Sequence, residues 1–457
     1  MATQYFYRIL WLMAGGLFMQ ASPSWAANAW AEKGQFQLDG VLSTTFIKLE
    51  TQPFKQEFSS KPITGIGDIT TELELRPNMA LAFDPCTTDI KPRMRTTHLN
   101  GQAEQVEANN TQVYLNTALV QCRLTPALEV SAGRQRLQWG NSLFRSPSNP
   151  FFAESVLFNP VDELLGKDFI TLEYRPNFNW QLSSIANPSE SHLDKPANPQ
   201  YEFIKTYGLK AEYTGETQHL GAIISQREHN PLRIGGFSHY TFNRALLLYG
   251  EFTASKDTSG RLPYSTQKYL NTDGNANATT ETTIEFAAAP LIEDKIRHTF
   301  LLGGSYTLLN GWTANIEYLD SSEGFNAQQA QAWQNAGGYA IQQLNNLNNT
   351  QQNPTPQMLN AAPLLADAYD PLWRQLRQHY LIVQYSRTEY RNKFDVALQN
   401  ISNLDDHSNS LALSVVYQSS DSTELFLVAN MNTGGGEREL GRLIENVVLL
   451  GLRFYTF

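Results

Sequence analysis

The chain has 457 residues, a formal net charge of −10, 11% aromatic residues and two cysteines. Charges of both signs are mixed along it and no long basic run occurs, so we expect no nucleic-acid partner. Two cysteines exclude a disulfide framework and a clustered cysteine metal site, and we expect neither a cofactor nor a metal.

The first 30 residues have the layout of a secretory signal peptide. Arg8 precedes an apolar run from Ile9 to Met19, and small residues follow it. This run is too short for a membrane-spanning helix. We expect cleavage after Ala26, with Ala29 as the alternative, so residues 1–26 are the signal peptide and residues 27–457 form the exported domain.

The rest of the chain has no segment that could form a membrane helix, but its apolar and polar residues alternate as they do in membrane strands. No later stretch approaches the roughly 20 apolar residues that a membrane helix needs, and the mean hydropathy is −0.37. In a barrel strand, lipid-facing and lumen-facing residues alternate, which dilutes the hydropathy. We therefore predict an all-β fold, a transmembrane antiparallel up-and-down β-barrel of about 16–18 strands. A soluble two-sheet β-protein is the competing interpretation.

Two segments before residue 84 are predicted to be strands. FQLDGVLSTTFIKL (36–49) and DITTELELRPNMALAF (68–83) both alternate apolar and polar residues. We expect segment 68–83 to run upward, away from the periplasm, and residues 84–110 to form an extracellular loop. The resulting strand count is odd, which indicates a missed strand, and TTIEFAAAP (282–290) is the candidate.

From residue 110 onward, alternating segments are joined by tight polar turns and by longer polar loops. In outer-membrane barrels the short turns are periplasmic and the long loops extracellular. The uncharged, Gln/Asn-rich stretch 325–362 is predicted to be an extracellular loop with a short helix around 330–344. Long connections cover 140–167, 187–203, 255–293 and 324–376. The tight turns lie at 123–126, 175–178, 214–217, 242–245, 309–311, 390–393 and 419–422.

The charged residues within strands indicate which face points to the lumen. In TTELELRP, two leucines alternate with charged residues, and an arginine or lysine facing lipid near mid-membrane would cost about 2–4 kcal/mol. The charged set must therefore face water. The residues assigned to the lumen and its constriction by this rule are Glu72, Glu74, Arg76, Glu129, Glu173, Arg175, Lys210, Glu212, Glu317 and Asp395.

SAGRQRLQWGNSLF (131–144) ends one predicted strand and carries Arg134 and Arg136. Strict alternation would turn both arginines outward, toward lipid. Two resolutions remain: a bulge at Gly133 turns both into the lumen, or they lie at headgroup level with Trp139 in the aromatic girdle. We favour the bulge and assign both arginines to the constriction, because glycine breaks the register and the following loop is expected to fold inward.

Cys86 and Cys122 belong to an exported chain, where thiols usually pair. The predicted topology places Cys122 beside a periplasmic turn and Cys86 in the extracellular loop 84–110, a membrane thickness apart. A disulfide between them requires that this loop descends into the lumen, or that the predicted strand directions near the N-terminus are wrong. Cys86 and Cys122 are therefore a candidate disulfide, and the sequence leaves open whether it forms.

The histidines carry no catalytic motif, and we expect no enzyme. None lies in a nucleophile elbow, an HExxH or another spaced motif. An outer-membrane hydrolase stays a third hypothesis, because side chains distant in sequence can converge. The candidates for it are His219, His239, His298, His379 and Asp405-Asp406-His407.

The chain resembles two sets of known sequences. Its final segment, ENVVLLGLRFYTF, carries Tyr455 and Phe457 and is similar to the C-terminal signal of Gram-negative outer-membrane proteins, which implies recognition by the barrel-assembly machinery. From about residue 110 onward it resembles porin-like outer-membrane proteins akin to the alginate-export-type barrels, although SLFRSPSNPFFAESVLF (142–158) is an insertion in that pattern. The residues that carry this resemblance are Gly133-Arg134-Gln135, Trp139-Gly140, Asn159-Pro160-Val161-Asp162 and KDFITLEYRPNFNWQL.

The resemblance implies a channel-like barrel in the outer membrane of a Gram-negative bacterium. Together with the alternation, it predicts a porin-like channel for passive diffusion or export of small hydrophilic solutes, surrounded by outer-membrane lipid. Acids and bases occur in roughly equal numbers in the predicted lumen, so no ion selectivity is predicted, and no pattern indicates an oligomeric state. The alternative is a structural or docking barrel that sheathes a periplasmic or secreted partner, such as an export or electron-transfer component.

Overall fold

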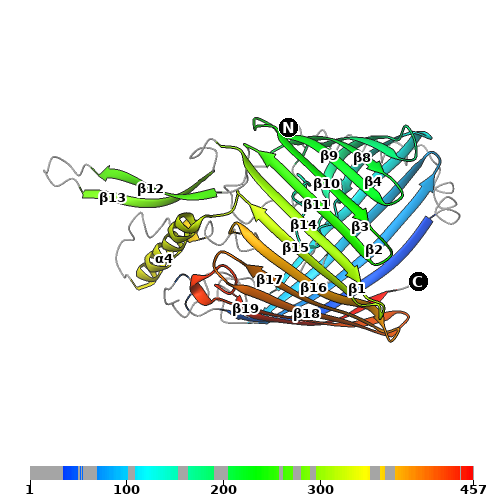
Figure 1. Ribbon diagram of the computed structural model, residues 1–457. Coiled ribbons are helices and arrows are strands. Elements are labelled where there is room, and N and C mark those ends of the chain that lie inside the picture. The colour runs from blue at the N-terminus through cyan, green and yellow to red at the C-terminus, as the bar shows by residue number, and fades with distance from the viewer. Residues whose placement is uncertain are drawn as a thin grey trace, which may run out of the picture.

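The structure is a closed antiparallel barrel of 18 strands (Figure 1), so the all-β barrel and its predicted size are confirmed. β1 (Gly34–Leu49) closes the barrel by pairing with β20 (Ile444–Tyr455). The computed structural model describes residues 34–49, 52, 54, 69–100, 109–152, 163–189, 204–256, 261–270, 279–288, 295–349, 361–365, 376–442 and 444–455. The predicted signal peptide lies outside these residues.

The other barrel strands follow one another around the wall, each paired with its neighbours in the chain. They are β2 (Ile69–Phe83), β3 (Cys86–Asn100), β4 (Asn109–Thr125), β5 (Leu128–Gln135), β6 (Lys167–Tyr174), β7 (Trp180–Asn187), β8 (Thr206–Thr214), β9 (Gln218–Arg227), β10 (Arg233–Thr241), β11 (Leu246–Ser255), β14 (Arg297–Thr307), β15 (Thr313–Ser321), β16 (His379–Tyr390), β17 (Phe394–Asn403), β18 (Asn409–Ser420) and β19 (Thr423–Thr433).

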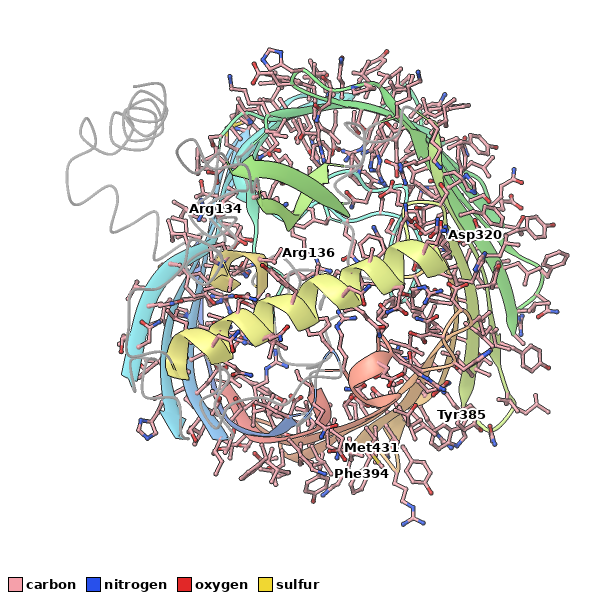
Figure 2. The ribbon with its side chains drawn as sticks, turned by 90° about the vertical axis from the view of Figure 1, so that its left-hand side faces the viewer. Arg134, Arg136, Asp320, Tyr385, Phe394 and Met431 are labelled. Atoms are coloured by element: carbon pink, nitrogen blue, oxygen red, sulfur yellow. A yellow bond between two sulfur atoms is a disulfide. The ribbon has the colours of Figure 1, made fainter. Side chains whose placement is uncertain are left out.

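Alternation along the strands places apolar side chains outside and polar ones inside. On β8, Leu209 is 62% exposed, whereas the side chain of its neighbour Lys210 is 11% exposed. On β15, Ile316 is exposed and Glu317 is fully buried. Figure 2, a view along the barrel, shows Tyr385, Phe394 and Met431 on the outside of the ring. Such a continuous apolar outer surface fits lipid rather than water.

All seven predicted tight turns join neighbouring barrel strands, as expected. They lie at one end of the barrel, which we call the turn end, and the long connections lie at the other, the loop end. The final strand runs to the turn end, because the amide of Tyr455 donates to the carbonyl of Ser422 in the turn between β18 and β19.

The predicted topology before residue 110 is wrong. Residues 86–100 form β3 and are not an extracellular loop, so β2 runs toward the turn end and not away from it. The tight turn between β2 and β3 contains Asp84 and Pro85. β3 was not predicted to be a strand, because Pro92 and threonines interrupt the apolar residues on its outward face. The candidate 282–290 is not the missing strand, since β13 (Thr279–Ala288) pairs only with β12 (Arg261–Leu270) in a separate hairpin.

The added strand brings the two cysteines together. Cys86 and Cys122 face each other across β3 and β4, with their Cα atoms 4.0 Å apart, and form a disulfide. The predicted separation by a membrane thickness was wrong, because it followed from the missing strand. Cys122 is also paired in register with Val130, whose side chain alternates with inward Glu129 and Ser131, so the bridge lies on the outer wall near the turn end.

The loop end carries two structures outside the barrel wall (Figure 1). The β12–β13 hairpin projects beyond the strands, and helix α4 (Ala327–Asn349) lies across the barrel mouth (Figure 2). The predicted helix in the Gln/Asn-rich loop is thus present and longer than expected. One face of α4 packs on Phe54 and Phe325, and the guanidinium of Arg442 lies 4.1 Å from the ring centre of Trp333. Among the described residues, no helix is both long and apolar enough to cross a membrane.

Candidate functional site in the barrel interior

The loop after β5 folds into the barrel. Its first described part, residues 136–152, is called the infolded segment. Trp139, Phe151 and Phe152 form a buried cluster with inward-facing residues of β6, β7, β9 and β10, including Phe169 and Phe237. The rings of Phe151 and Phe169 meet edge to face at 5.1 Å. These contacts anchor the segment on the inner wall, because edge-to-face aromatic pairs add to the energy of apolar burial.

A wall carboxylate holds the start of the infolded segment. Glu251 on β11 is 2% exposed, and its Oε1 accepts the backbone amides of Asn141 (3.1 Å) and Ser142 (3.2 Å). Its Oε2 accepts the hydroxyls of Ser146 (2.6 Å) and Ser148 (2.9 Å). A buried charge must be compensated by donors, and here the donors all come from the infolded segment.

A second wall carboxylate continues the same contact. Glu317 on β15 accepts the amide of Leu143 at 2.6 Å and the hydroxyl of Tyr249 at 2.7 Å. It also accepts the hydroxyl of Ser142 at 3.4 Å. Glu251 and Glu317 therefore form one device, called here the carboxylate clasp, which fixes residues 141–148 against β11 and β15.

Gly140 allows the approach to the clasp, which leads to a first prediction. Its φ is +81°, and a Cβ placed there would lie 2.2 Å from Oε1 of Glu251. The substitution Gly140→Ala should displace the infolded segment, because it adds both backbone strain and a clash with a buried carboxylate. We expect a larger single-channel conductance than in the native protein. An unchanged conductance would contradict this role of Gly140.

An arginine holds the far end of the same loop on the opposite part of the wall. Arg93 on β3 is 1% exposed, and its guanidinium donates to both carboxylate oxygens of Glu163, at 2.5 and 2.9 Å. The side-chain amide of Asn116 donates to Glu163 as well. Burial alone would raise the pKa of Glu163, but hydrogen bonding and the charge of Arg93 outweigh it and hold that pKa below its ordinary value. The loop is thus anchored to β11 and β15 near its start, and to β3 near its end.

The predicted lumen residues form two groups on the inner wall. On β2, Glu74 accepts from Arg76 (2.7 Å) and from the hydroxyl of Tyr114 (2.8 Å), and Glu72 lies beside them. On β5 to β8, a ladder of charges runs toward the turn end. Its ion pairs are Arg175 with Glu173 at 2.6 Å and with Glu129 at 3.7 Å, and Lys210 with Glu212 at 2.7 Å. Glu317 belongs to the clasp described above.

The assignment of Arg134 to the lumen is wrong. Pairing of β5 with β4 and β6 continues through Gly133 without a shift, so no bulge turns the arginine inward. Arg134 shares the outward face of β5 with Val130 and Ala132, and its guanidinium pairs with Asp168 at 2.9 Å. Gly133 is needed for a different reason: its φ is +128°, and a Cβ there would lie 2.0 Å from the carbonyl oxygen of Ala118.

The remaining predicted residues lie apart from the two groups. Arg136 follows the end of β5, is exposed and donates to Gln138, whereas Trp139 is buried in the infolded segment and not in a girdle. Asp395 accepts the amide of Glu389 at a turn. The hydroxyl of Tyr455 donates to Glu424, and Phe457 lies outside the described residues.

Four of the candidate histidines fall into two sets. His219 and His239 face the lumen side by side on β9 and β10. His298 and His379 both lie 3.2 Å from the carboxylate of Asp320, which alternates outward with Tyr318 on β15. His379 also pairs with Asp405 at 2.8 Å.

Sequence reasoning missed three residues that fix the loop. Glu251 alternates with Leu248, Gly250 and Phe252 in LLLYGEF, so the rule that found Glu317 also applied to it. Arg93 was hidden in the segment predicted to be a loop. Glu163 follows the Asn-Pro-Val-Asp motif of the resemblance but carried no signal of its own.

Comparison with known proteins concerns the fold. No family model matches the sequence, and no curated protein matches it. The structure of Pseudomonas aeruginosa OccK5 (OpdH) superposes with a TM-score of 0.53 at 8% identity, over 93% of this chain and 99% of that chain. OccK11 (OpdR) of the same bacterium superposes with a TM-score of 0.51 at 9% identity, over 93% of this chain and 96% of that chain. The chain shares the fold of these two proteins. The structure of Acinetobacter baumannii OccAB1 superposes with a TM-score of 0.50 at 10% identity, over 93% of this chain and 96% of that chain. The porin-like resemblance is thus confirmed for the architecture.

Proposed function

We propose that this protein is an outer-membrane channel for small hydrophilic solutes, narrowed by the loop between β5 and β6. The observation that carries the proposal is the infolded segment, held inside the 18-stranded barrel by buried wall carboxylates. A barrel of this size usually encloses an aqueous lumen, and a loop fixed across it sets the width of the passage. The inner wall carries charges of both signs, which suits hydrated solutes.

The outer surface supports placement in the outer membrane. Large apolar side chains cover the outward face of the strands, and aromatic residues gather near the turn end. Trp312 and Tyr385 stack there at 4.6 Å, and Phe394 lies 4.9 Å from Tyr417. A girdle of this kind marks the membrane interface of bacterial barrels. We assign the turn end to the periplasm, and we propose that the C-terminal strand is recognised by the barrel-assembly machinery.

The test is single-channel recording of the refolded full chain in planar bilayers. We expect stable, ohmic steps whose size scales with the conductivity of the salt solution. Electrically silent protein that co-purifies with a periplasmic partner would favour the docking barrel. Turnover of a lipid or peptide substrate that is lost on replacing a lumen histidine would favour an enzyme.

A further inference from the structure

We propose that His219 and His239 form a binding site for a divalent transition-metal ion such as Cu²⁺, Ni²⁺ or Zn²⁺ on the lumen wall. The two histidines are paired in register across β9 and β10 and point inward near the turn end. Imidazole is a ligand that these ions prefer. The site goes beyond the proposed channel function, because ion binding does not require the channel to conduct.

The spacing of the two rings fits one shared ion. Their centres are 5.1 Å apart and their planes are inclined by 75°. Two imidazoles that bind one tetrahedral ion through bonds of about 2.0–2.1 Å have ring centres about 5 Å apart. The ring of Phe237 contacts that of His219 edge to face at 5.1 Å, which limits its rotation. The pair is therefore arranged for binding before an ion arrives.

The hydrogen-bonding state of the two rings supports the same site. Oε1 of Glu212 lies 3.5 Å from Nε2 of His219. A carboxylate on this side favours the tautomer with the proton on Nε2 and a lone pair on Nδ1. Metal-binding histidines are commonly oriented by a carboxylate in this way. Among the described residues, Nδ1 of His239 is buried and has no hydrogen-bond partner. A metal ion would satisfy a ring nitrogen on both side chains.

The residues around the two histidines determine how many protein ligands the metal ion would have and which charges lie near it. Among the described residues, no group of three or more His, Cys, Asp or Glu side chains is placed to hold a metal, so two imidazoles and water would complete the coordination. Lys210 is the nearby cation, but its ammonium is 2.7 Å from Glu212 and lies over the ring of Trp139 at 4.6 Å. Its charge is thus neutralised locally. A site with two protein ligands should exchange its ion readily, which suits a channel wall.

The test is Cu²⁺ titration of the folded full chain in detergent, followed by electron paramagnetic resonance. The background is H298Q/H379Q, which removes the histidine pair beside Asp320 on the outer wall while leaving the lumen unchanged. We expect one Cu²⁺ per barrel, with hyperfine coupling to two imidazole nitrogens. His219→Gln or His239→Gln should each abolish the two-nitrogen signal. Glu212→Gln should keep that signal and weaken binding about 10–100-fold.

A two-nitrogen spectrum that persists in the variant H219Q/H239Q would overturn the proposal, as would the absence of nitrogen coupling in the background protein. Both outcomes are independent of conductance. A silent protein that still binds Cu²⁺ through these histidines would refute the channel alone, and a conducting protein without the signal would refute the metal site alone. Unchanged heat-modifiable gel mobility checks that each variant is folded.

Discussion

Replacing Glu251 by alanine is expected to release the infolded segment and to raise the single-channel conductance. The carboxylate accepts two amides and two hydroxyls from that segment. Leaving one buried donor unpaired costs about 1–3 kcal/mol. These costs are not additive, but a net loss of about 3 kcal/mol shifts the ratio of docked to released segment roughly 100-fold.

Two further variants make this result specific. Glu424→Ala removes an inward carboxylate on β19, where it contacts Tyr455 and Arg453 and not the infolded segment, so we expect native conductance. In the Glu251→Ala protein, a disulfide between Ser148→Cys and Gly235→Cys should restore the smaller conductance, because a Cβ on Gly235 would lie 3.4 Å from Cα of Ser148. Equal conductance in native and Glu251→Ala protein would show that the segment does not set the width.

Replacing Arg93 by methionine is expected to free the far end of the loop and to remove an acid response of the channel. Breaking a fully buried ion pair costs about 3–5 kcal/mol, but a third of the Glu163 side chain is exposed, so we expect a loss nearer 2 kcal/mol. The depressed pKa of Glu163 means that this contact is fully present above the ordinary glutamate pKa of about 4.3 and is lost as pH falls through the lower, folded value.

Conductance recorded between pH 7 and pH 3 checks this prediction. The native channel should keep a constant conductance down to about pH 4.3 and open further below it. The Arg93→Met channel should already be wider at pH 7 and should show a smaller acid response. Arg453→Met is the matched control, since this inward arginine pairs with Glu424 at 3.5 Å, away from the loop. A native-like acid response in Arg93→Met would argue against the Arg93–Glu163 anchor.

Much of the wall was predictable because alternation is a local property. Glu74, Glu212 and Glu317 each stand between apolar neighbours, and the cost of a charge in lipid decides which way they face. The same rule failed at β3, where Pro92 breaks the apolar face. One missing strand then reversed the predicted direction of β2 and placed Cys86 at the wrong end of the barrel.

The approximate strand number, the lumen polarity and the short turns could thus be derived from residues close together in the chain, since strand alternation and turn chemistry act over a few positions. The infolded segment could not, because its donors and acceptors are remote: Ser146 meets Glu251 across 105 residues. Arg134 shows the same limit, since only pairing with β4 and β6 decided that Gly133 serves a close backbone approach and not a bulge. Strict alternation alone would have placed the arginine outward, and the unbroken register with both neighbouring strands shows that the alternation holds through Gly133.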